Sequence, residues 1–237
     1  MSTGTIDWEE CAAEYEAARV RVTALLPDDR HRDTVVSSCP DWTVADLCAH
    51  LAGVSGALVV GDLPGADVQA WVDGQVATRR GRSIASLLDE WATITPAFQQ
   101  LMVSQGGRIA GLLYDIVVHE HDLRGAIGQP GARESRGVVL SLGFGRLALH
   151  SDMKRAGPGV VEVVSADGSW RAGEAGERDA EVRLDLSDRA DGTWELLRLL
   201  GSRRSRSQVA AYPWQGDWTA IETGLFHMPL PAADLIE

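Results

Sequence analysis

The residues best suited to chemistry lie in one short segment, residues 115–122, which holds two histidines and two aspartates. On an α-helix, residues four apart are separated by only about 40° around the axis, so Asp115 and His119 project together. Asp122 falls on the same side, whereas His121 lies about 160° from His119. The segment therefore offers one carboxylate and one imidazole as possible metal ligands, with Asp122 placed to support them.

A third ligand is available from an earlier helix. His50 lies at the flank of an apolar stripe, roughly 80° from its centre, where a side chain can enter a helical bundle near its mouth. Two imidazoles and one carboxylate with an open fourth position are the ligands expected of catalytic zinc. Nickel and iron(II) accept similar ligands, and spacing alone also allows a surface pair or a hydrogen-bonded core pair.

The remaining candidates have plainer explanations. His121 is expected to be solvated or paired with a neighbouring acid, and Glu120 to be solvated, because both point away from the Asp115 and His119 side of the helix. Cys48 is expected to be a small buried hydrophobic residue. No partner at ligand spacing is evident for the other histidines, His31, His150 and His227.

Helices must position these side chains, and the first half of the chain reads as helical. Apolar periodicity, N-terminal capping pairs such as Thr43 with Asp46, and a stop at Gly128 predict the boundaries. The expected helices cover residues 7–26, 43–60, 83–103, 112–127 and 138–154, with a less certain segment over 68–78 and a possible bend or break at Pro96. Helices of this length joined by loops suggest an up-and-down bundle.

The pattern changes near residue 157. Residues 160–164 and 182–186 read as short strands, the first followed by an Ala-Asp-Gly hairpin turn at residues 166–168. Residues 194–200 read as a helix, and Ser205 with Gln208 predicts the start of another. We therefore expect an α+β protein, with a helical bundle over residues 1–156 and a smaller mixed α/β domain over residues 157–237.

Composition restricts the partners and the location. The formal net charge of -12 disfavours nucleic acid and an acidic membrane surface, because both require a basic face. The start of the chain does not read as a signal peptide, and no apolar run approaches the ~18 residues that suggest a membrane span. Three cysteines without CxxC spacing favour reduced thiols. These features predict a cytoplasmic protein, either a monomer or a homodimer.

Two motifs together resemble a known family. CPDWTVADLCAHLAG at residues 39–53 and DIVVHEHDLRGAIG at residues 115–128 are similar to the mycothiol-dependent maleylpyruvate isomerase family, and GSRRSRSQVAAYPWQGD at residues 201–217 is similar to its C-terminal segment. The resemblance implies a DinB-like helical bundle that carries zinc, followed by a small α/β domain. It also implies that His50 and His119 are metal ligands, and that Asp115 stands where the family has glutamate.

The resemblance further implies a mechanism. A divalent metal, zinc in the family, stabilises the thiolate of mycothiol as a nucleophile toward an electrophilic or unsaturated acid. The product is then either an isomer or a thioether, so we expect an isomerase or an S-transferase. Because the family uses an external thiol, none of Cys11, Cys39 and Cys48 need be the nucleophile.

Three questions stay open at this level. Asp122 is expected to hold His119 by a hydrogen bond, to pair with Arg124 or to cap a loop. Arg203 and Arg204 are candidate catalytic residues that hold a carboxylate, although, with Arg206, they also suit a helix C-terminus. The shorter Asp115 favours an alternative function, a non-catalytic small-ligand-binding protein with a weakened metal site.

Overall fold

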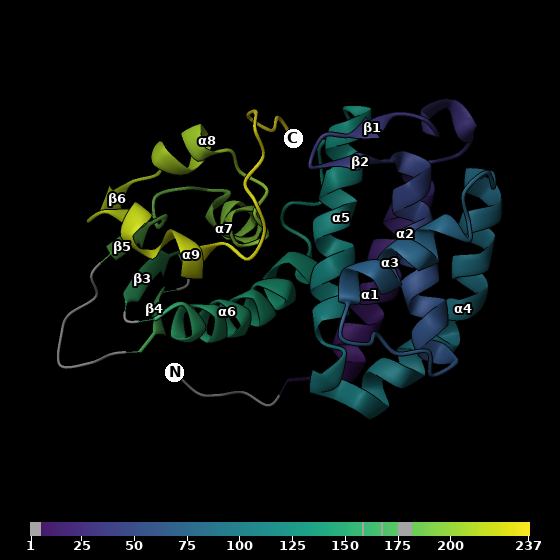
Figure 1. The fold of residues 1–237 in the computed structure, drawn as a ribbon, viewed down its shortest axis with the longest axis horizontal. Helices are drawn as coiled ribbons and strands as arrows, with labels where there is room; N and C mark the ends of the chain where they lie inside the picture. Colours follow the sequence, from purple (N-terminus) through teal and green to yellow (C-terminus); the bar gives the residue numbers. More distant parts are fainter. Residues whose placement is uncertain (1–5, 158, 167, 175–181) are drawn as a thin grey trace. The chain divides into compact units, whose positions relative to one another are not determined.

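The structure is a computed structural model that describes residues 6–157, 159–166, 168–174 and 182–237 (Figure 1). The chain divides into two compact units, Met1–Gly131 together with Glu237, and Ala132–Ile236. The first is helical and the second combines helices with a sheet, so the predicted α+β class is confirmed.

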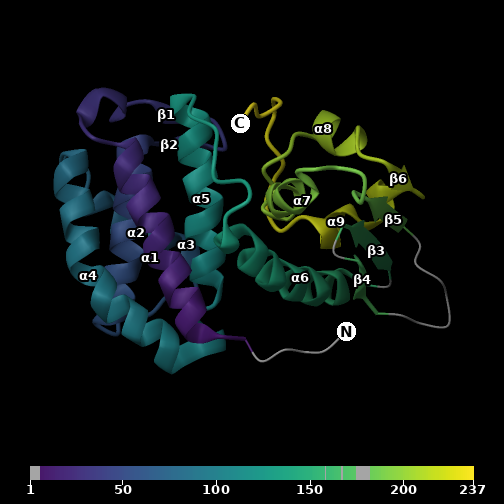
Figure 2. The same cartoon turned by 180° about the vertical axis from the view of Figure 1, so that it is seen from behind.

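The first unit is a bundle of helices. Its long members are α1 (Trp8–Leu25), α2 (Val44–Val59), α4 (Ile84–Gln105) and α5 (Gly111–Ile127). Helices α1 and α2 each pack against α4 and α5, and the shorter α3 (Val68–Ala77) covers α2; α1 lies in front of the bundle in Figure 2. Short 3-10 turns at Asp29–His31 and Gly106–Arg108 and two strands, β1 (Val35–Val36) and β2 (Cys39–Thr43), complete it.

Local signals set the helix boundaries as the sequence predicts. Thr43 and Asp46 form a complete capping box at the start of α2. Gly128 ends α5 in the left-handed conformation, with φ of 66°, where glycine has no Cβ penalty. Pro96 lies inside α4, which continues through it as one helix.

A buried polar network joins three helices of the bundle. The hydroxyl of Tyr15 on α1 lies 2.6 Å from that of Ser55 on α2, and Trp91 Nε1 on α4 donates to Tyr15 Oη at 3.0 Å. Ser55 in turn donates to the Leu51 carbonyl. Burial raises the pKa of Tyr15, so the phenol remains a neutral member of a satisfied network.

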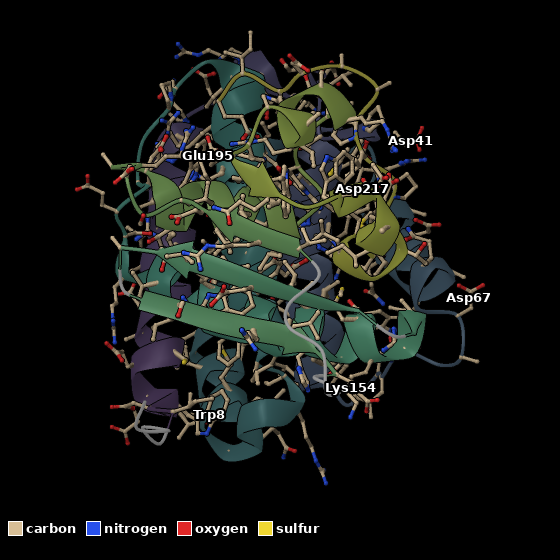
Figure 3. All side chains as sticks on the ribbon, turned by 90° about the vertical axis from the view of Figure 1, so that its left-hand side faces the viewer. Trp8, Asp41, Asp67, Lys154, Glu195 and Asp217 are labelled. Atoms are coloured by element: carbon tan, nitrogen blue, oxygen red, sulfur yellow. The ribbon has the colours of Figure 1, made fainter. Side chains whose placement is uncertain are left out.

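The second unit is a four-stranded sheet with helices. Its strands are β3 (Val160–Ser165), β4 (Gly168–Gly173), β5 (Val182–Asp185) and β6 (Trp214–Gln215), in the order β4-β3-β5-β6, and β3 with β5 is the parallel pair. Figure 3 shows this sheet face-on. The helices are α6 (Arg136–Ala156), α7 (Gly192–Leu200), α8 (Arg206–Ala210) and α9 (Glu222–Leu225), with a 3-10 turn at Trp218–Ile221.

The expected hairpin joins β3 to β4, whose antiparallel register runs from Val160 opposite Gly173 to Ser165 opposite Gly168. Asp167 of the expected turn lies outside the described residues. The capping box of Ser205 with Gln208 opens α8 as predicted.

The boundary between the units differs from the position near residue 157 that composition suggested. Helix α6 belongs to the second unit, because its buried residues pack with the sheet and with α7 and α9. The shared core includes Leu142, Leu149 and Met153 of α6, Leu184 of β5 and Leu196 of α7. The apolar periodicity of α6 predicts a helix, but it does not predict that the apolar face packs against the sheet of the second unit.

Among the described residues, no single helix has both the length and the apolar character needed to cross a membrane. The α4 and α5 segments pass that test only when taken together, and a 115° bend separates them.

Candidate metal centre

Helix α2 carries the first of the expected ligands. Its capping box at Thr43 and Asp46 fixes where the helix begins, and His50 lies in the second turn, 5% exposed. The ring of Trp42, in the preceding strand β2, lies 4.9 Å from the His50 ring between centroids. His50 Nδ1 is buried and has no hydrogen-bond partner in the described part of the chain, so its ring is oriented by Trp42 and by the contacts of Nε2.

Helix α5 carries the other two expected ligands, Asp115 and His119. His119 is 6% exposed, and the Asp115 side chain, one turn earlier, is 31% exposed. The apolar side of the same helix is buried in the bundle through Leu113, Ile116 and Val117. Burial of that side fixes the rotation of α5, and this rotation turns Asp115 and His119 toward α2.

The three side chains converge. His50 Nε2 lies 3.1 Å from Asp115 Oδ2 and 3.4 Å from Oδ1, and His119 Nε2 lies 3.4 Å from Asp115 Oδ1. The two imidazole rings meet nearly edge to face, with centroids 5.0 Å apart. One ligand atom from each residue lies within 4.8 Å of the others.

These separations fit a divalent cation. A tetrahedral ion with bonds of about 2.0–2.1 Å separates its ligand atoms by about 3.3–3.4 Å, and the measured distances to Asp115 are close to this value. Two imidazoles and a carboxylate suit zinc and leave a fourth position open. The structure therefore brings together the three residues that the sequence suggested, and metal binding by them stays a prediction.

Asp122 orients one of these ligands. Its Oδ2 lies 2.8 Å from His119 Nδ1, and an ionised carboxylate can only accept, so Nδ1 carries the proton and donates it. With Nδ1 bonded to Asp122, Nε2, which faces Asp115, is the ring atom that would bind a cation, in exchange for any proton that it carries. The expected hydrogen bond between Asp122 and His119 is therefore present, and Arg124 bonds Glu120.

The electrostatics of the cluster also favour a cation. Burial would raise the pKa of Asp115, but the charges and hydrogen bonds of His50 and His119 outweigh it and hold that pKa well below its ordinary value. Burial would lower the pKa of His119, and the carboxylates of Asp115 and Asp122 outweigh it and raise that pKa. The carboxylate therefore stays ionised at neutral pH, the form in which it binds metal.

Two neighbours were not assigned to the site from the sequence alone. Trp42 lies beside both imidazoles, with its ring centroid 6.1 Å from that of His119. Cys39, at the start of β2, places Sγ 3.9 Å from Asp122 Oδ2 and interacts with His119, so it reaches the supporting side of that ring. Both residues lie just before the capping residue Thr43 in the sequence, and this position was the only signal that could have placed them near His50.

One expectation for the opposite side of α5 is wrong, and one alternative of another is excluded. Glu120 is fully buried rather than solvated, because Arg21 of α1 bonds it at 2.8 Å and Arg124 bonds it at 2.9 Å. His121 is also buried, at 2% exposed, so it is not solvated, and its pairing with a neighbouring acid stays a prediction. Both sides of α5 are therefore covered by protein. The periodicity of α5 could not reveal this, because the charged partner, Arg21, lies on a different helix.

The C-terminal arginines are largely enclosed within the second unit. Arg204, 3% exposed, donates from Nε to Glu195 at 2.9 Å and from Nη1 to the Arg203 carbonyl at 2.7 Å. Arg203, 7% exposed, donates to the Gly201 carbonyl at 2.6 Å. Arg206 is exposed and paired with Glu222. Arg204 thus reaches the first turn of α7 and Arg203 the residue that ends it, and a catalytic role for Arg203 or Arg204 stays a prediction.

Cys11, Cys39 and Cys48 are thiols that form no disulfide in the structure. Cys48 is fully buried as expected, and burial raises its pKa to about 12, so it remains a protonated, inert thiol at neutral pH.

The first unit of the chain is similar to a known family. Residues 11–124 match the family model described as the mycothiol maleylpyruvate isomerase N-terminal domain. This stretch contains the four residues of the cluster: His50, Asp115, His119 and Asp122. Neither a curated protein nor a solved structure gives a significant match to the chain.

Proposed function

Because residues 11–124 match the N-terminal domain of the mycothiol maleylpyruvate isomerase family, we propose that this protein is a metal-dependent enzyme that uses mycothiol as its thiol cosubstrate. The observation that carries the proposal is the convergence of His50, Asp115 and His119 at distances that suit a divalent cation. Zinc is the cation that best suits this ligand set.

When bound, the cation would stabilise a thiolate and so supply a nucleophile at neutral pH. His50, Asp115 and His119 would hold it. Asp122 keeps His119 in the tautomer that presents Nε2, and the donated Nδ1 proton restricts rotation of the ring.

The surroundings of the cluster strengthen its electrostatics. Trp42 covers the imidazoles on one side, and buried apolar residues of α2 and α5, including Leu47 and Ile116, exclude water from the bundle beneath them. Charges interact more strongly in such a setting than in water. The partial exposure of Asp115 leaves this end of the cluster accessible to small molecules.

Two fates of the substrate distinguish the possible reactions. The thiolate of mycothiol adds to an activated double bond of an unsaturated acid, the former double bond rotates as a single bond, and expulsion of the same thiolate gives an isomer. If the carbon–sulfur bond persists on an electrophilic substrate, the reaction is an S-transfer. We propose that Arg203 or Arg204 holds a carboxylate of the substrate or part of the cosubstrate, since a guanidinium forms paired hydrogen bonds to such groups. We also propose a cytoplasmic location for the enzyme.

The test is mycothiol-dependent turnover. Zinc-loaded protein is assayed with mycothiol and either maleylpyruvate or a simple electrophile, beside His119→Ala and the exposed control His150→Ala. The proposal predicts turnover that requires mycothiol, is lost in His119→Ala and persists in His150→Ala. Turnover that is independent of mycothiol, or equal in the two variants, would contradict it.

A second candidate is a non-catalytic protein that binds a small ligand on the same fold. It is favoured by Asp115, one methylene shorter than the family's glutamate, and by the 3.1 Å separation of His50 Nε2 and Asp115 Oδ2, which is also a hydrogen-bond distance. Asp115→Glu separates the two functions. If the parent protein has negligible turnover and this variant gains it, the binding protein is favoured.

A further inference from the structure

A second polar hollow lies in the first unit, apart from the histidine cluster. Its volume is about 220 Å³, and it is bordered by the segment around Arg32, the start of α2 and the turn between α3 and α4. That turn supplies three arginines within four residues, Arg79, Arg80 and Arg82. Gly81, between them, has φ of 86°, a left-handed conformation that favours glycine and turns the chain here.

Two of these arginines form a fixed wall. Arg79 donates to Glu90 from Nε at 3.0 Å and from Nη2 at 2.7 Å, and its Nη1 donates to the Gln75 carbonyl. Arg82 bonds the other Glu90 oxygen through Nη1 and the Ser86 carbonyl through Nη2. Each nitrogen of these two guanidinium groups already has a protein partner, so the two side chains supply charge and rigidity to the hollow.

The other two arginines keep donors available. Arg80 bonds Asp46 through Nε alone, at 3.0 Å, and its side chain is 60% exposed. Arg32 bonds the Arg82 carbonyl through Nε and the exposed Asp33 through Nη1, each at 3.3 Å. Within the described residues, neither Nη atom of Arg80 nor Nη2 of Arg32 has a hydrogen-bond partner.

The charge balance of the hollow is positive. The four guanidinium groups of Arg32, Arg79, Arg80 and Arg82 are bonded to only three carboxylates, Asp33, Asp46 and Glu90. Among these bonded groups the positive charges exceed the negative ones by one, on a protein with a formal net charge of -12. The start of α2 adds the positive end of a helix dipole.

The first amides of α2 do not bind a ligand themselves. Val44 N donates to the Thr34 carbonyl, Ala45 N to the Arg32 carbonyl and Asp46 N to the Thr43 hydroxyl. A ligand in this hollow must therefore be recognised by the free guanidinium donors, whose planar fork matches the oxygens of a phosphate or carboxylate group.

We propose that this hollow binds a small oxyanion of the phosphate class, either free phosphate or the phosphate group of a small molecule, through Arg80 and Arg32. The volume is below the ~300–1,000 Å³ typical of pockets for drug-sized ligands, which suits a compact anion. Asp46 already holds Arg80 and the Arg82 carbonyl already holds Arg32, which reduces the conformational entropy lost on binding. This site is independent of the proposed enzymatic function.

The test is isothermal titration calorimetry with inorganic phosphate, and with glycerol phosphate as a phosphate monoester, against chloride at matched ionic strength. The variants are Arg80→Ala, Arg32→Ala combined with Arg80→Ala, and the control Arg155→Ala, which removes an exposed, singly paired arginine. His119→Ala is titrated as well, to separate this site from the histidine cluster. A parallel NMR titration of the unaltered protein follows the Arg80 and Arg32 Nε–H signals.

We expect phosphate to bind in preference to chloride, and binding to weaken about tenfold or more in Arg80→Ala, because hydrogen bonds to a charged group are lost. Arg155→Ala and His119→Ala should bind as the parent does. Tighter binding of the monoester than of free phosphate would assign the site to a phosphorylated small molecule, and the reverse would assign it to phosphate itself. Equal binding in Arg80→Ala and Arg155→Ala, or no response of the Arg80 and Arg32 signals, would overturn the proposal.

Discussion

At the scale of single residues, the two ring nitrogens of His119 have different tasks. Nδ1 donates to Asp122 at 2.8 Å, and Nε2 faces Asp115 at 3.4 Å. His50 has no comparable support, because its Nδ1 has no hydrogen-bond partner in the described part of the chain. The orientation of the candidate centre therefore depends on Asp122 more than on any contact of His50.

Asp122→Asn tests this dependence. The neutral amide removes the charge that stabilises the Nδ1–H tautomer and can turn its NH₂ toward the ring, so we expect zinc affinity to fall about 10–100-fold. Competition with a chromogenic chelator measures the change, and the exposed Asp89→Asn is the matched control. Equal affinities in the two variants would show that Asp122 does not support the ligand.

At the scale of elements, α5 is covered on two sides for different reasons. One side presents Asp115 and His119 to α2, and the other buries Glu120 against Arg21 of α1. The second contact fixes α5 to its neighbour through a bidentate pair, with donor–acceptor distances of 2.8–3.0 Å. This buried pair therefore helps to determine where the ligands on the other side of α5 lie.

Glu120→Gln is expected to destabilise the protein by about 1.5–3 kcal/mol, because it removes a buried charge that receives hydrogen bonds from Arg21 and Arg124. Urea unfolding followed by circular dichroism measures the loss. Glu16→Gln, which breaks the more exposed pair with Arg19, should cost less than about 1 kcal/mol. If the two substitutions cost the same, the buried pair does not stabilise the bundle as described.

The boundaries of helices could be predicted from the sequence where they depend on residues that are close together in the chain. The capping boxes at Thr43 and Ser205 and the glycine stop at Gly128 depend on neighbours within a few residues, and all three are present. The burial of Glu120 could not be read, because its partner Arg21 is 99 residues away in the chain. The same limit applies to Cys39, whose contact with Asp122 joins a strand to a distant helix.

At the scale of the whole molecule, the chain is two compact units that divide after Gly131. The first contains the histidine cluster and the arginine hollow, and the second builds its core from α6, the sheet, α7 and α9. The sequence predicted two domains of these kinds but assigned α6 to the bundle. Apolar periodicity shows that one face of a helix is buried, but it does not identify the element that packs against that face.

This division predicts how fragments of the second unit behave. A fragment of residues 132–236 retains Leu142, Leu149 and Met153 and should unfold cooperatively in urea. A fragment of residues 157–236 lacks α6 and exposes the apolar side chains it covered, so it should bind a hydrophobic dye and lose cooperativity. Equal cooperativity of the two fragments would contradict the assignment of α6.

Metal content tests the central claim most directly. The parent protein, His50→Ala, Asp115→Ala, His119→Ala and the control His150→Ala are purified identically, loaded with zinc, desalted and measured by inductively coupled plasma mass spectrometry. We expect about one zinc per chain in the parent and in His150→Ala, and strong depletion in the other three variants. Equal zinc in all five proteins, or none in the parent, would contradict a metal centre formed by His50, Asp115 and His119.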